Sequence, residues 1–192
     1  MKQAINLLVL ALLLAGCSRE QDPVAYAEND RNGLKKTITV GDVNYTILYK
    51  TPAYIARKEH LDKTAEAARE KQLQGMAWFN IAFSISGYNQ SPLRYQVSGQ
   101  EEYAARQNYY LNEAPNDIYL LYGSDTLYVS SYWFENSQNL LPFETIIVGF
   151  KLPGNVQQPE QDLKLSFYDR VFKNGIIKAV IKKEDLEDTP GL

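Results

Sequence analysis

The sequence has few of the residues from which catalytic and metal centres are built. It contains one cysteine and one histidine in 192 residues. One cysteine excludes an intrachain disulfide and a multi-cysteine zinc site, and one histidine excludes a metal site that needs two or more. The glycines are scattered, with no Gly-x-Gly-x-x-Gly pattern and no phosphate-binding loop. We therefore expect no metal, no cofactor and no nucleotide partner.

An excess of charge of one sign is also missing. The chain has 20 basic and 23 acidic residues, whereas nucleic-acid binding needs a concentrated basic surface. Hydrophobic residues make up 45% and charged residues 22% of the sequence, which is typical of a globular protein and excludes wholesale disorder. The composition predicts a globular domain with no nucleic-acid partner.

Long hydrophobic runs are absent as well. Residues 7–14 are eight apolar residues in succession and follow the basic Lys2. A membrane-spanning helix needs about 20 residues, whereas a basic residue before a short apolar run is typical of a secretory signal. This segment predicts export without a transmembrane anchor.

The run ends in Leu14-Ala15-Gly16-Cys17, which resembles the lipobox of bacterial lipoproteins. The resemblance covers residues 1–17 only. It implies that residues 1–16 are a cleaved signal peptide, and that Cys17 is lipidated with diacylglycerol and a further acyl chain such as palmitate. Two or more chains give stable membrane attachment. The family pattern, with Ser18 rather than aspartate after the cysteine, implies the outer membrane of a Gram-negative bacterium; the periplasmic and the surface face both stay open.

The segment after the cysteine has no apolar periodicity and many turn-forming residues. We expect residues 17–33 to be the lipidated cysteine and a flexible tether. Residues 34–192 are then a single β-rich domain, whose acidic end from residue 184 onward is frayed.

Period-two alternation of apolar and polar residues dominates this domain. Two helices are expected between the strands, at residues 51–74 and 98–112, and the strands do not alternate strictly with them. The pattern favours a mainly β fold, an antiparallel β-sandwich with two inserted helices, of which an immunoglobulin-like arrangement is one form. A barrel, or an α+β fold with helices on one face of an antiparallel sheet, is the alternative. The expected strands are residues 34–40, 43–50, 76–86, 117–122, 126–135, 145–152, 163–168 and 176–182.

Candidate catalytic residues are few. His60 lies in the polar predicted helix, where it is expected to face solvent. Glu135 and Glu144 are the candidates for a carboxylate-dependent hydrolase, which needs two carboxylates about 5–9 Å apart. Glutamates at strand ends are usually just solvated, so we expect a protein that is not an enzyme.

The fourteen tyrosines are the most informative remaining feature. Tyrosine combines a large apolar face with a polar tip, which suits both binding surfaces and the core of a β-protein. On strand 126–135, Tyr128, Tyr132 and Phe134 share one face. They form an exposed ligand-binding row if the aliphatic face is buried, and part of the core if it is not; the core is favoured for at least half of the tyrosines.

These features lead to three functional hypotheses. The first is a membrane-anchored cell-envelope lipoprotein whose non-catalytic β-rich domain binds an envelope partner or contributes to an assembly. The second is a surface glycan-binding lipoprotein that uses exposed tyrosines. The third is a hydrolase that uses Glu135 or Glu144.

Overall fold

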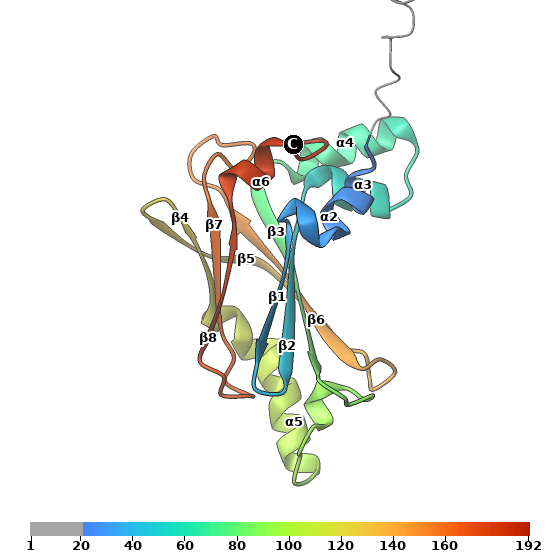
Figure 1. The fold of residues 1–192 in the computed structure, drawn as a ribbon, viewed down its shortest axis with the longest axis vertical. Coiled ribbons are helices and arrows are strands. Elements are labelled where there is room, and N and C mark those ends of the chain that lie inside the picture. Colours follow the sequence, from blue (N-terminus) through green and yellow to red (C-terminus); the bar gives the residue numbers. More distant parts are fainter. Residues whose placement is uncertain (1–20) are drawn as a thin grey trace, which may run out of the picture.

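The structure, a computed structural model, describes residues 21–192, so the predicted signal peptide and Cys17 lie outside the described residues. The chain forms antiparallel strands with short helical segments at both ends of the sheet (Figure 1). In chain order the elements are α2 (Pro23–Glu28), η1 (Asp30–Asn32), β1 (Lys35–Val40), β2 (Val43–Lys50), α3 (Pro52–Lys58), α4 (Lys63–Leu73), β3 (Met76–Ile85), η2 (Pro92–Arg94), α5 (Gln100–Asn108), η3 (Tyr109–Glu113), η4 (Ala114–Asp117), β4 (Ile118–Tyr122), β5 (Asp125–Glu135), β6 (Phe143–Lys151), β7 (Leu163–Tyr168), β8 (Ile176–Ile181) and α6 (Lys183–Glu187).

All the predicted strands are confirmed, and so is a mainly antiparallel β fold. The strands form one eight-stranded sheet in the order β1-β2-β3-β6-β5-β4-β7-β8. Each strand is hydrogen-bonded to the next through the whole order, so the sheet does not divide into two separate layers. The immunoglobulin-like sandwich is therefore not confirmed.

Strand β5 joins the two halves of the sheet. Its first half pairs with β4, where Tyr128 lies opposite Tyr119, and its second half pairs with β6, where Trp133 lies opposite Ile147. A bulge interrupts the pairing between Val129 and Ser131, and a bulge bends its strand and increases the local twist. The curved sheet brings its two edge strands, β1 and β8, side by side (Figure 1).

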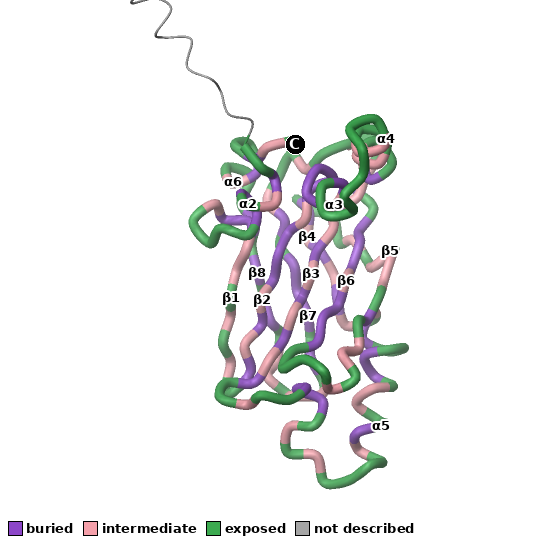
Figure 2. Tube along the Cα trace, turned by 90° about the vertical axis from the view of Figure 1, so that its right-hand side faces the viewer, coloured by how far each residue is buried: buried purple, intermediate pink, exposed green. Residues whose placement is uncertain are grey.

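The hydrophobic core fills the inside of this curve. On β3 every second residue is buried, including Phe79, Ile81 and Phe83, and β4 and β8 show the same alternation. Figure 2 shows the buried residues of the sheet in purple. Burial of one such side chain contributes about 1.5–3 kcal/mol. Tyr110 from η3 stacks between Phe83 and Phe134, at ring-centroid distances of 4.8 and 5.3 Å. Aromatic rings therefore form the centre of the lower core.

The helices cover the two open ends of the curve. Figure 1 places α2, α3, α4 and α6 with the C-terminus at the upper end and α5 at the lower end. None of the helices in residues 21–192 is long and apolar enough to cross a membrane.

The packed domain begins before Leu34. The Asp22 carboxylate accepts a hydrogen bond from the Val24 amide at 3.1 Å and caps α2, which starts at Pro23. An aspartate cap followed by proline is a favourable helix start. Tyr26 and Ala27 are buried against the core, so the stretch that the sequence predicted as tether is packed from residue 22 onward.

The end of the chain is also packed rather than frayed. Helix α6 buries Leu186, and the Thr189 hydroxyl donates to the Asp185 carbonyl at 2.8 Å. Lys36 on β1 forms an ion pair with Asp185 at 3.7 Å. The acidic C-terminal segment therefore helps to cover the junction between β1 and β8.

The predicted helix 51–74 is divided into α3 and α4. His60 sits in the break in a left-handed conformation, with φ of +54°. The Asp62 carboxylate then accepts hydrogen bonds from the amides of Thr64 and Ala65, both at 3.0 Å, and starts a second helix. His60 is thus an exposed turn residue rather than part of a helix.

Candidate binding surface

The three predicted ligand-binding aromatics of β5 do not lie on one surface. Tyr128 is 75% exposed, whereas Phe134 is only 7% exposed and Tyr132 is half-buried against the core. The bulge between Val129 and Ser131 adds one residue, which shifts the alternation of faces along the strand. Only Tyr128 of the three therefore remains available to a ligand.

Behind Tyr132 and Phe134 lies a buried polar network centred on Asp169. The Tyr132 hydroxyl donates to the Tyr110 carbonyl, and the Tyr110 hydroxyl donates to Asp169 at 2.9 Å. Asp169 also accepts from the Tyr45 hydroxyl at 2.9 Å. This fully buried carboxylate thereby connects β2, η3 and the turn after β7.

Burial decides the protonation behaviour of this network. It raises the pKa of Asp169, and the hydrogen bonds from Tyr45 and Tyr110 offset part of that rise. Burial and the negative charge of Asp169 raise the pKa of both tyrosine hydroxyls, which stay protonated as donors. We interpret the network as an internal clasp of the curved sheet.

The raised pKa of Asp169 predicts in which direction the stability of the folded protein changes with pH. The folded state holds the proton more tightly than the unfolded chain, whose aspartates titrate near 3.9. The contribution of this group to stability is therefore full below the unfolded pKa and falls as pH rises to the folded pKa. The quantity to compare is the free energy of unfolding of the wild type minus that of Asp169→Asn. We expect this difference to decline as pH rises from the unfolded to the folded pKa of Asp169. Urea unfolding at a series of pH values measures it; a difference that grows with pH would contradict it.

Glu135 and Glu144 face opposite sides of the sheet. Glu135 lies opposite Thr145, the residue after Glu144, and successive strand residues point to opposite faces. Glu144 is 1% exposed and accepts hydrogen bonds from the Ser91 hydroxyl at 2.5 Å and the Ser137 amide at 2.6 Å. Glu135 points outward and is exposed. The two carboxylates therefore do not share a cleft.

The outer side of the second half of the sheet carries the most exposed tyrosines. Tyr128 on β5 lies opposite Tyr119 on β4, and Tyr119 lies opposite Ser166 on β7. Tyr168, two residues further along β7, is 45% exposed. Lys178 on β8 lies opposite Ser166, which places a cation in the same row. We call this surface the tyrosine face and define it by Tyr119, Tyr128, Tyr168, Lys164 and Lys178.

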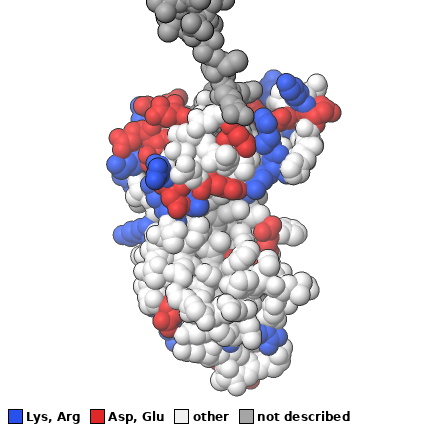
Figure 3. All heavy atoms as spheres, turned by 45° about the vertical axis from the view of Figure 1, so that its right-hand side comes forward, with Lys and Arg blue, Asp and Glu red and all other residues white. Residues whose placement is uncertain are grey.

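The outer side of the first half of the sheet has a different character. Trp133 is 65% exposed and lies in one row with Ile147 and Asn80. The ring of Trp78 covers Gly149, where a Cβ atom would lie 2.8 Å from it. In Figure 3, which brings the β6 side forward, the charged residues gather at the upper end and the lower part is largely uncharged. This surface is aromatic but nearly neutral.

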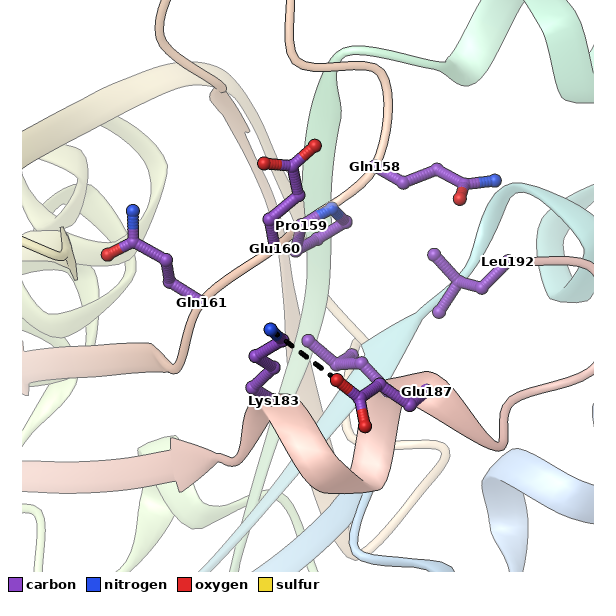
Figure 4. A pocket seen from close by; sticks show the side chains of 8 residues that line it. Gln158, Pro159, Glu160, Gln161, Lys183, Glu187 and Leu192 are labelled. Carbon is purple, nitrogen blue, oxygen red and sulfur yellow. Dashed lines mark ion pairs between the residues drawn. The ribbon is translucent and has the colours of Figure 1, made fainter.

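The surface of residues 21–192 also has several openings. A groove of about 460 Å³ lies between the outer side of β3 and the loop before β6, lined among others by Ala82, Tyr88 and Phe143. A cleft of about 510 Å³ lies at the upper end between residues 158–161 and α6 (Figure 4). Its Lys183 pairs with Glu187 at 3.5 Å, and both are exposed, so the pair contributes little. Among residues 21–192, no cluster of His, Cys, Asp or Glu is placed to hold a metal ion.

Only part of the tyrosine face could be predicted from the sequence. Tyr128 was a candidate, but Tyr119 and Tyr168 were not, because their common face depends on pairing between strands that are distant in sequence. Asp169 carried no local signal at all, since the tyrosines that donate to it lie 124 and 59 residues away in the sequence.

Comparison with known proteins leaves the family open. No protein-family model and no curated protein sequence matches the chain. Among solved structures it is similar to a DUF4426 family protein from Pseudomonas aeruginosa PAO1, with 7% sequence identity over 78% of this chain and 94% of that chain and a TM-score of 0.36. A similarity of this degree assigns neither a fold family nor a function.

Proposed function

We propose that this protein is a lipid-anchored, non-catalytic binding protein of the bacterial cell envelope, held in the outer membrane by acyl chains on Cys17. The lipobox-like residues Leu14-Ala15-Gly16-Cys17 support the anchor. The tyrosine face supports the binding role. Tyr128 is the observation that carries it, since its side chain is 75% exposed on β5, a strand of the sheet.

The position of the first packed residue supports a close attachment. Asp22, the cap of α2, comes five residues after Cys17. An extended chain reaches at most about 3.6 Å per residue, so the connection is about 18 Å or less. The upper end of the domain, where α2 lies, is then next to the membrane. Neither outer side of the sheet then faces the membrane, and both point sideways.

Glycan binding is the second candidate function. The specific observation in its favour is the tyrosine face, where Tyr119, Tyr128 and Tyr168 occupy neighbouring outward positions. Tyrosine rings supply contact area with little loss of side-chain entropy and carry a hydroxyl for hydrogen bonds.

The anchor is tested by substitution of its acceptor. We expect cells grown with a labelled fatty acid to label the wild-type protein and not Cys17→Ser, because the thiol is the site of diacylglycerol transfer in the family that the motif resembles. Cys17→Ser is expected to accumulate as the uncleaved precursor. Ser18→Ala, which keeps the thiol, is the matched control and stays labelled. Label on Cys17→Ser would show that the lipid is attached elsewhere.

A further inference from the structure

We propose that the tyrosine face binds an acidic polysaccharide, a polymer that contains uronic acids. This inference rests on the proposed binding role and does not depend on the lipid anchor. Its basis is the arrangement of rings and cations on the outer side of β4, β7, β8 and the first half of β5.

The rings lie at the spacing of adjacent strands. Tyr128 and Tyr119 are directly opposite, and such pairs have Cβ atoms about 4.5–5.5 Å apart. Tyr168 is diagonal to Tyr119 across the β4–β7 pair, at a typical distance of about 7–8 Å. Ser166, the small residue opposite Tyr119, is buried although it faces outward. Neighbouring side chains therefore cover Ser166, and the rings form one contiguous surface against which successive sugar rings can stack.

The charge of this face is opposite to that of the whole chain. The chain has a formal net charge of −3, but the outward positions of these strands hold Lys164 and Lys178 and no acidic residue. Lys164 approaches Asp162, before β7, only to 3.9 Å, with both side chains about half exposed. Lys178 forms no ion pair within residues 21–192. An anionic ligand complements this surface.

The mixture of rings and cations favours a polysaccharide over an acidic protein. Protein interfaces concentrate apolar groups at a centre that is depleted of charge, whereas the exposed aliphatic residues of this face, Ile176 and Val180, lie on the edge strand β8 with Lys178 between them. Here Lys178, Ser166, Tyr119 and Tyr128 follow one another in a single row across the sheet. A uronic-acid polymer matches this row, because each sugar offers an apolar ring face to tyrosine, hydroxyl groups for hydrogen bonds and a carboxylate to lysine.

The test is affinity electrophoresis of the full-length protein, extracted from membranes in detergent, in gels that contain polygalacturonate. We expect polygalacturonate to retard the wild type and neutral dextran to leave it unaffected. Tyr128→Ala and Lys178→Gln should each weaken the affinity about 3- to 10-fold. Both side chains are exposed, so thermal unfolding should be unchanged. Trp133→Ala, which removes a ring that is 65% exposed on the other outer side, is the matched control and retains the wild-type affinity.

Several results would overturn the proposal. These are no retardation by polygalacturonate, equal weakening by Trp133→Ala, or retardation that depends on Lys178 but not on Tyr128. Equal retardation by polyglutamate would instead indicate an acidic protein partner, and so would also overturn it. Each of these results leaves the fatty-acid labelling of Cys17 unaffected, so failure of the glycan proposal and failure of the anchor are distinguishable.

Discussion

Replacing Asp169 by alanine is expected to lower the free energy of unfolding by about 3–5 kcal/mol. The carboxylate is fully buried and accepts hydrogen bonds from the hydroxyls of Tyr45 and Tyr110 and from the Val171 amide, each at 2.9 Å. Alanine leaves these donors buried without a partner, and each unpaired group costs about 1–3 kcal/mol. Urea unfolding followed by circular dichroism measures the change.

Two milder variants locate the origin of this effect. Asp169→Asn keeps one acceptor oxygen, so we expect a smaller loss than with alanine. Tyr45→Phe removes a single hydroxyl and is expected to cost about 1–2 kcal/mol. If Asp169→Ala unfolds at the same urea concentration as the wild type, the clasp does not hold the lower end of the sheet together.

Removal of the Glu144 side chain is expected to have the second-largest effect. Glu144→Ala should destabilise the protein by about 2–4 kcal/mol, because the Ser91 and Ser137 groups that donate to the carboxylate lose their buried acceptor. The Ser137 bonds hold the start of the β5–β6 loop, and the Ser91 bond holds the turn before η2. Chemical denaturation again provides the measurement.

Glu135→Ala is the matched control for this prediction. Glu135 lies almost beside Glu144 in the sheet but on the exposed side, so its removal is expected to change stability by less than about 0.5 kcal/mol. The hydrolase hypothesis instead requires that both carboxylates act on one substrate. Equal stability of the two variants, together with loss of a hydrolytic activity in both, would contradict the structural role of Glu144.

The alternation of apolar and polar residues was sufficient to predict the strands, but not the curvature of the sheet that they form together. On β3, Phe79, Ile81 and Phe83 alternate with polar or small residues, and all three are buried as that pattern predicts. On β5 the same reasoning failed, because the bulge after Val129 has no signature in the alternation itself. A single extra residue moved Tyr132 to the inner side and left Tyr128 outside.

The start of the predicted helix 51–74 was correct. The Thr51 hydroxyl accepts a hydrogen bond from the Tyr54 amide at 3.0 Å, and α3 begins at Pro52. Asp22-Pro23 carries the same chemistry, but the polar residues around it suggested a tether instead. The domain boundary was therefore placed about a dozen residues too late, although the cap that fixes it is visible in the sequence.

The long-range contacts could not be predicted from the sequence. The Asp169 clasp joins β2, η3 and the turn after β7. The tyrosine face follows from a strand order in which β4 lies between β5 and β7. No local pattern encodes that order. The exposed ring of Tyr128 was the one part of the candidate surface within reach of sequence reasoning.

We propose that the β-rich binding domain is attached to the envelope through Cys17. The most direct test is the intact mass of the protein purified from membranes of the native organism. We predict a chain that lacks residues 1–16 and carries, on Cys17, the mass of a diacylglycerol thioether and of an amide-linked acyl chain. An unmodified chain that begins at Met1 would contradict the account.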